Sequence, residues 1–151
     1  MKETILALKA DLTTNGFCDY YSGDNVFLSI DEDLLPRDVT FPAIGIKDGE
    51  IDYLYEEYGT RQKTYTIDLW VYYEAPTADE THTGSGAANP DGILGFMKNL
   101  VDHLEHNKLG IASIEQGLPL RETPSELFGG EDFFVMRKML TIEYVRLEET
   151  I

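Results

Sequence analysis

The chain has 151 residues, of which 42% are hydrophobic and 26% charged, and it contains nine Tyr and seven Phe. This length and composition are typical of one folded domain with a sizeable core, and they exclude a disordered chain. Twenty-eight acidic residues against twelve basic ones give a net charge of −16. Such a chain repels phosphates, which excludes a nucleic-acid binder that works by neutralising the backbone. The acidic charge serves either solubility or a surface past which DNA moves without sticking.

Cysteine usage and hydropathy indicate the compartment. Cys18 is the single cysteine of the sequence, so no intramolecular disulfide forms, and we expect this residue to be a small buried or half-buried hydrophobe. No apolar run approaches the roughly 20 residues that a membrane span needs, and we expect no signal peptide. The sequence therefore predicts an aqueous, reducing compartment, the cytoplasm of a host, and no membrane partner.

The first predicted element is a helix over residues 2–15. Ile5, Leu8 and Leu12 fall on one face of such a helix. Asn15 and the glycine after it are typical of a helix end, because both tolerate the left-handed conformation.

Short strands follow the first helix. Apolar runs predict strands over residues 26–30, 41–46 and 51–55. The acidic residues 31–33 predict a loop, and the Asp-Gly pair within residues 47–50 predicts a turn between the last two strands.

The strongest periodic signal lies in residues 62–74. Apolar side chains recur there at every second position, which predicts a long strand with one wholly buried face; they are Tyr65, Ile67, Leu69, Val71 and Tyr73. Trp70 and Tyr72 project from the opposite face. They pack either beneath a helix of the same chain or against another subunit, and aromatic side chains dominate the centres of interfaces.

Residues 76–90 are polar and predict a long, mobile loop, which in a compact domain is usually functional. Asn89, Pro90 and Asp91 then suit the start of a second helix as N-cap, first helical residue and acid at the positive end of the dipole. The buried stripe of this helix is predicted to consist of Ile93, Met97, Leu100, Val101 and Leu104, with Lys108 and Gly110 closing it.

The last third of the chain predicts a short strand over residues 111–114, a connection over residues 118–130, and a long strand over residues 133–147. Strands outnumber crossover helices. The fold class is therefore α+β, with an antiparallel or mixed sheet and two helices packed on one face. The two long strands form the centre of the sheet, and residues 1–151 form a single domain.

No motif in the sequence carries catalytic chemistry. His103 and His106 are three residues apart, whereas a zinc-binding helix places its histidines four apart. The acidic residues 31–33 and 56–57 lack the alternation of a calcium loop, and residues 84–86 lack the lysine of a phosphate loop. A Gly-x-Ser-x-Gly nucleophile motif is absent as well. We predict no enzyme activity, no catalytic residue, no metal ligand and no cofactor.

The arrangement of these elements resembles the tail terminator (tail-completion) and minor tail proteins of long-tailed bacteriophages. The resemblance spans almost the whole chain. Its features are the helix at residues 5–12, the Phe41-Pro42-Ala43-Ile44 strand start, the aromatic strand entered through Tyr58-Gly59-Thr60-Arg61, the mobile loop, the second helix and the terminal strand at residues 137–147.

This resemblance implies a virion subunit that forms a hexameric ring at the end of the tail tube. Such a ring stops tube polymerisation and joins the tail to the head connector, and DNA passes through its lumen without specific binding. The implied partners are further copies of the chain, the tail tube protein and the head–tail connector proteins. The candidate interface residues are Trp70, Tyr72, Arg61, Asp79, Glu80 and His82; the last three lie in the predicted loop, which would contact a neighbouring subunit or the tube.

Two alternatives stay open. The chain could be a head-completion or connector protein of the same neck region. It could also be a small enzyme or ligand-binding domain with residues 76–90 as a lid, which requires a concave apolar pocket with convergent polar groups.

Overall fold

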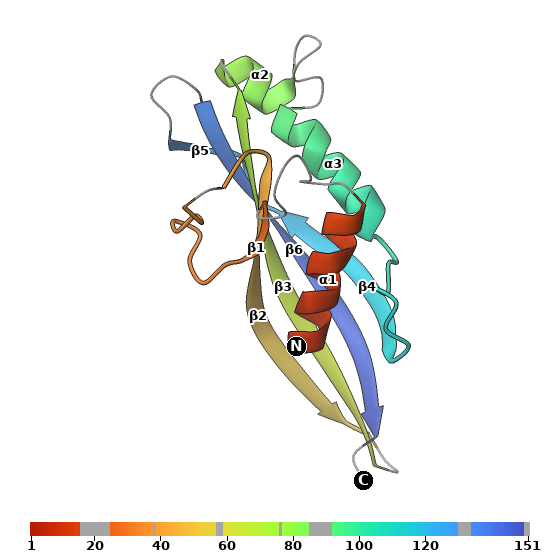
Figure 1. Ribbon diagram of the computed structural model, residues 1–151. Coiled ribbons are helices and arrows are strands. Elements are labelled where there is room, and N and C mark those ends of the chain that lie inside the picture. The colour runs from red at the N-terminus through yellow and green to blue at the C-terminus, as the bar shows by residue number, and fades with distance from the viewer. Residues whose placement is uncertain are drawn as a thin grey trace.

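Figure 1 shows the computed structural model, which describes residues 1–15, 25–37, 39–56, 59–75, 77–84, 92–129 and 134–149. The described part is an α+β fold with a mixed six-stranded sheet and three helices, as predicted except for the third helix. In chain order the elements are α1 (Lys2–Thr14), β1 (Val26–Leu28), β2 (Ala43–Tyr55), β3 (Thr60–Ala75), α2 (Ala78–Thr83), α3 (Gly92–Leu104), β4 (Ile114–Glu122), β5 (Glu126–Gly129) and β6 (Phe134–Glu149).

The two longest strands lie at the centre of the sheet, which confirms the prediction. β3 and β6 pair antiparallel along their whole length, from Thr60 opposite Glu149 to Ala75 opposite Phe134. The strand order is β1-β2-β3-β6-β4, with β5 paired to residues 135–137 of β6. Among the strands of the described residues, only β1 runs parallel to its neighbour, which makes the sheet mixed.

β2 is one continuous strand, so the turn predicted at residues 47–50 is wrong. The pairing with β3 shifts by one residue between Asp48 and Ile51, which is a β-bulge. Gly49 sits in the bulge, and a Cβ built there would lie 2.5 Å from the backbone oxygen of Thr66. The glycine therefore permits close backbone contact with β3 instead of reversing the chain.

The main core lies between the sheet and the helices α1 and α3, which cover the same face (Figure 1). The predicted buried face of β3 is confirmed, because its five alternating apolar side chains are all at most 7% exposed. Leu8 and Leu12 of α1 are fully buried against it, and Ile5 is partly buried. From α3 the core receives Ile93, Phe96, Met97, Leu100 and Leu104.

The segment predicted as a loop over residues 76–90 contains the short helix α2. Thr77 caps it, since the Thr77 hydroxyl accepts a hydrogen bond from the Glu80 N–H at 3.2 Å. Thr81 is buried; its hydroxyl donates to the Thr77 carbonyl at 2.8 Å and also lies 3.2 Å from the Phe134 carbonyl of β6. Residues 85–91, including the predicted cap of the next helix, lie outside the described residues.

The connection predicted over residues 118–130 is also wrong, because most of it forms the strands β4 and β5. Because of the prolines and glycines in this segment, local propensity predicts a connection where the structure has strands. Pro119 is compatible with β4 because this strand lies at the edge of the sheet, where a missing N–H breaks no ladder. The strand predicted at residues 111–114 begins only at Ile114.

Candidate interaction surfaces

Trp70 and Tyr72 lie on the face of the sheet opposite the helices. Tyr72 is fully buried there, in a second cluster with Phe27 and Ala43. Partly buried hydrophobic residues pack against this cluster, namely Leu35, Val39, Phe41, Trp70 and Phe128. Tyr72 therefore packs neither beneath a helix nor on an open surface, because Leu35, Val39 and Phe41 of the same chain pack against its cluster. Its side chain contributes to this core, whereas Trp70 is half-buried and reaches the surface.

Arg137 is the centre of a cluster on the same face. Its guanidinium carbon lies 5.3 Å from the ring centroid of Trp70 and 4.9 Å from that of Phe128. Its Nη1 donates to Asp33 Oδ1 at 2.6 Å, and its Nε donates to Glu126. We call Arg137, Trp70, Phe128, Asp33 and Glu126 the Arg137 cluster. It links β3, β5 and β6 to the acidic residues 31–33.

Tyr72 also holds the acidic residues 31–33 against the sheet. Its hydroxyl donates to the Glu32 carbonyl at 2.5 Å, and burial raises the pKa of Tyr72 to about 12. Lys47 of β2 lies 3.7 Å from the Glu32 carboxylate. The acidic segment predicted as a free loop is therefore fixed to the sheet by contacts from three strands.

Arg61 lies at the far end of the sheet, where β2, β3 and β6 extend beyond α1 (Figure 1). Its Nη2 donates to Glu148 at 2.8 Å, and Lys63 donates to the same carboxylate at 3.0 Å. These two hydrogen bonds, first that of Lys63 and then that of Arg61, lower the pKa of Glu148 to about 2. Both cations lie over the Tyr53 ring, at 5.4 and 6.0 Å. We call this end of the three strands, residues 51–55, 60–64 and 145–149, the strand arm.

The predicted loop residues Asp79, Glu80 and His82 all lie on α2. Asp79 is exposed, and Glu80 and His82 are partly exposed. α2 packs on α3 and on the Ala75 end of β3, which is the opposite end of the sheet from Arg61. The structure thus divides the six predicted interface residues among three places: α2, the Trp70 face and the strand arm.

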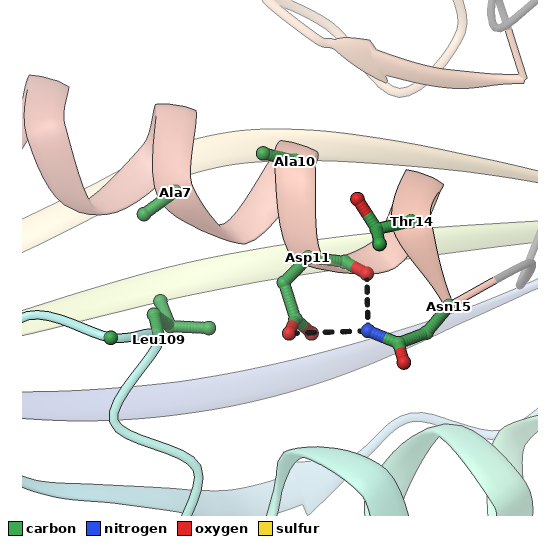
Figure 2. Close-up of a pocket in the computed structure, with 7 residues that line it drawn as sticks. Ala7, Ala10, Asp11, Thr14, Asn15 and Leu109 are labelled. Carbon is green, nitrogen blue, oxygen red and sulfur yellow. Dashed lines mark hydrogen bonds between the residues drawn. The ribbon is translucent and has the colours of Figure 1, made fainter.

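A shallow groove of about 460 Å³ separates α1 from the loop that follows α3 (Figure 2). It is lined by Ala7, Ala10, Asp11, Thr14, Asn15, Leu109 and Gly110. The Asp11 carboxylate lies 2.6 Å from His103 Nε2, and Asn15 and Asn107 donate to it at 3.4 and 3.5 Å. The charged group of the groove is thus occupied by internal partners. None of the lining residues belongs to α2, the described part of the predicted lid.

His103 and His106 do not form a joint site. α3 ends at Leu104, and His106 follows in the left-handed conformation with φ 63°. His103 contacts α1, whereas His106 is exposed beside Glu105 at 3.8 Å. Within the described residues, no three His, Cys, Asp or Glu side chains gather in a way that could hold a metal ion; Cys18 lies outside them. No helix in the described part of the chain is long and apolar enough to span a bilayer.

Arg137 and Glu148 organise two of these surfaces, and neither was predicted from the sequence as an interface residue. Their partners are distant in the sequence: Glu148 pairs with Arg61, and Arg137 pairs with Asp33. One signal was present for Arg137, since it is a charged residue inside a long, largely apolar strand and such residues are seldom buried without partners. Glu148 lies beyond the strand predicted over residues 133–147, so this signal did not apply to it.

No protein-family model and no curated protein matches the chain. Among solved structures, the fold is similar to that of a chain in the virion of the native gene transfer agent (GTA) particle, with a TM-score of 0.51 and 13% sequence identity. The similarity covers 96% of this chain and 94% of that one. At this identity it shows a shared fold over nearly the whole length of both chains.

Proposed function

We propose that this chain is a structural virion protein of a tailed phage or phage-like particle. In this proposal it forms a ring at the end of the tail tube, stops tube polymerisation and joins the tail to the head connector, and DNA passes through the ring. The observation that carries the proposal is the shared fold with a chain of a gene transfer agent virion, which extends over 96% of this chain.

The distribution of candidate surfaces supports a bridging role. Asp79, Glu80 and His82 lie at the Ala75 end of β3, and Arg61 lies at the other end of this strand of 16 residues. An extended strand of that length spans roughly 50 Å. A subunit that joins a tube to a connector needs two separate contact surfaces, and this chain offers them at opposite ends of one rigid sheet.

The charge also supports passage of DNA. A net charge of −16 disfavours adhesion to phosphates. A rigid subunit with buried central strands suits a closed cyclic assembly, in which each copy repeats the same contacts.

The proposal is tested by measuring the mass of the purified chain, alone and on assembled particles, together with the length of tail tubes polymerised in its presence. We expect a cyclic oligomer on the tube and tubes of limited length. The double substitution Asp79→Lys with Glu80→Lys is expected to weaken tube capping. Glu105→Lys with Glu115→Lys, which changes the charge equally at exposed sites away from α2, is the control. A chain that stays monomeric and leaves tube length unchanged would overturn the proposal.

A head-completion or connector role is the nearest rival. Both roles require a ring in the neck, so the mass alone does not separate them. Imaging of labelled particles does, because a terminator lies at the end of the tube and a connector protein lies against the portal.

A further inference from the structure

The outer edge of β2 is open along the strand arm. β1 covers this edge only from Ile44 to Ile46. From residue 47 to residue 55, no strand in the described part of the chain pairs with it. Figure 1 shows this half of β2 at the border of the sheet, below β1.

The direction of the free backbone groups follows from the hydrogen bonds. The Ile44 N–H donates outward to Asn25 at 2.7 Å, and the Ile46 carbonyl accepts from Ser29 at 2.8 Å. The bulge after Asp48 adds one residue, so beyond it the outward groups belong to residues 51, 53 and 55. The backbone of Glu56 is consistent with this alternation, because its N–H faces inward and donates to the Thr60 carbonyl at 2.9 Å. Three N–H groups and three carbonyls thus face outward from one short segment.

The side chains of this segment are unusually apolar for a free edge. Tyr53 is 51% exposed, Leu54 56% and Tyr55 68%. A long open edge with exposed apolar side chains is a template for an added strand, and folded proteins normally protect such edges.

The opposite edge of the sheet has that protection. On β4, the Gly117 carbonyl already accepts a hydrogen bond from the His106 N–H at 2.9 Å. Pro119 has no N–H to offer, and the pairing of β4 with β6 is shifted twice. β4 therefore offers a less regular edge to an added strand than residues 51–55 of β2 do.

The charge of the open β2 edge determines which kind of strand is attracted to it. Asp48, Glu50 and Asp52 are all exposed, and Lys47, the single cation of β2, lies beside Glu32. Two such edges would repel one another, which disfavours a pair of β2 strands from two copies of this chain. A strand with basic side chains would be attracted.

We propose that residues 51–55 of β2 accept an added strand from another protein, in the form of an extended segment that alternates basic and apolar residues. The main-chain groups of residues 51, 53 and 55 supply the hydrogen bonds, and the three acidic side chains and the exposed Tyr53–Tyr55 segment select the sequence. This inference goes beyond the proposed ring, because a monomer can accept a strand as well as a ring can.

The test uses the full chain labelled with ¹⁵N and a peptide of ten residues that alternates lysine and valine. We expect saturable shifts and slower hydrogen exchange at the amides of residues 51, 53 and 55. The amides of residues 52 and 54 already face β3, so their exchange should change little. The same peptide N-methylated at every residue, which leaves no N–H to donate from either edge, and a peptide alternating glutamate and valine, should not bind. Equal binding of the N-methylated peptide, or no binding of the lysine peptide, would overturn the proposal.

Substitutions separate the edge from charge in general. Glu50→Lys with Asp52→Lys should weaken binding of the lysine peptide by on the order of tenfold or more, since it reverses two charges at the edge. Glu105→Lys with Glu115→Lys makes the same change in net charge near β4 and should bind almost normally.

Tyr53→Pro removes one outward N–H without breaking the ladder to β3 and should also weaken binding. Protection of residues 51–55 that depends on protein concentration without peptide would instead assign the edge to a second copy. Capping of tubes is measured separately, so either proposal can fail alone.

Discussion

The guanidinium of Arg137 lies over the indole ring of Trp70, with 5.3 Å between Cζ and the ring centroid. The same guanidinium donates to Asp33 and Glu126. This side chain of β6 therefore joins the half-exposed aromatic residue of β3 to the acidic segment that accepts the hydrogen bond from Tyr72. Loss of Arg137 should release that segment from the sheet.

Arg137→Ala should lower the free energy of unfolding by about 2 kcal/mol, because charge-assisted hydrogen bonds and a cation–π contact are lost together. Urea denaturation measures this change. Arg137→Lys keeps the charge but not the planar fork, so it should recover only part of the loss. Hydrogen exchange should rise at residues 31–35 and remain unchanged in α3. Uniform loosening of both regions would contradict the role assigned to the cluster.

Tyr72→Phe should cost about 1 kcal/mol, the usual net contribution of one hydrogen bond, since it removes the donor to Glu32. It should also change the alkaline stability. The pKa of Tyr72 is about 12 in the folded chain and 10.0 when unperturbed, so the unfolded chain loses this proton first. The stabilisation is complete below pH 10 and is lost as the pH rises towards 12.

Burial also raises the pKa of Tyr144, so Tyr72→Phe should reduce the alkaline loss of stability without abolishing it. Stability curves from pH 8 to pH 12 for Tyr72→Phe, Tyr144→Phe and the double variant separate the two contributions. Identical curves for Tyr72→Phe and the unmodified chain above pH 10 would refute this assignment.

Glu148→Gln should flatten the acid limb of the stability curve. The pKa of Glu148 falls from 4.5 to about 2 on folding, so the unfolded chain takes up this proton first. The stabilisation is present above pH 4.5 and is lost as the pH falls through 2. Because the group is partly exposed, we expect less than about 1 kcal/mol from it. Denaturation between pH 2 and pH 7 measures it, and Glu105→Gln, at an exposed site, should leave the acid limb unchanged.

Gly49→Ala should destabilise the chain by about 2 kcal/mol or more, because overpacking against rigid backbone cannot be relieved by a rotamer change. The new Cβ would lie 2.5 Å from the Thr66 carbonyl oxygen. Gly129→Ala is the matched control within a strand, since nothing lies within 4 Å of a Cβ there. Equal effects of the two substitutions would show that the bulge is not tightly packed.

The sequence by itself determined the elements whose signals are local. The alternation at residues 65–73 defined β3 and its buried face, and the helical spacing of Ile93, Met97 and Leu100 defined α3. These patterns suffice because the side-chain period of a strand or a helix is fixed by its own backbone. They also gave the fold class and the central position of the two long strands.

Only the tertiary structure decided where edges, turns and covers lie. Asp48-Gly49 became a bulge and residues 114–122 an edge strand because pairing with β3 and β6 overrode local propensity. Tyr72 became a core residue because Leu35, Val39 and Phe41 pack around it, and Glu148 became an ion-pair centre because β6 places it beside Arg61. Such contacts join residues far apart in the chain, so their partners are fixed by strand register and packing, which no local pattern encodes.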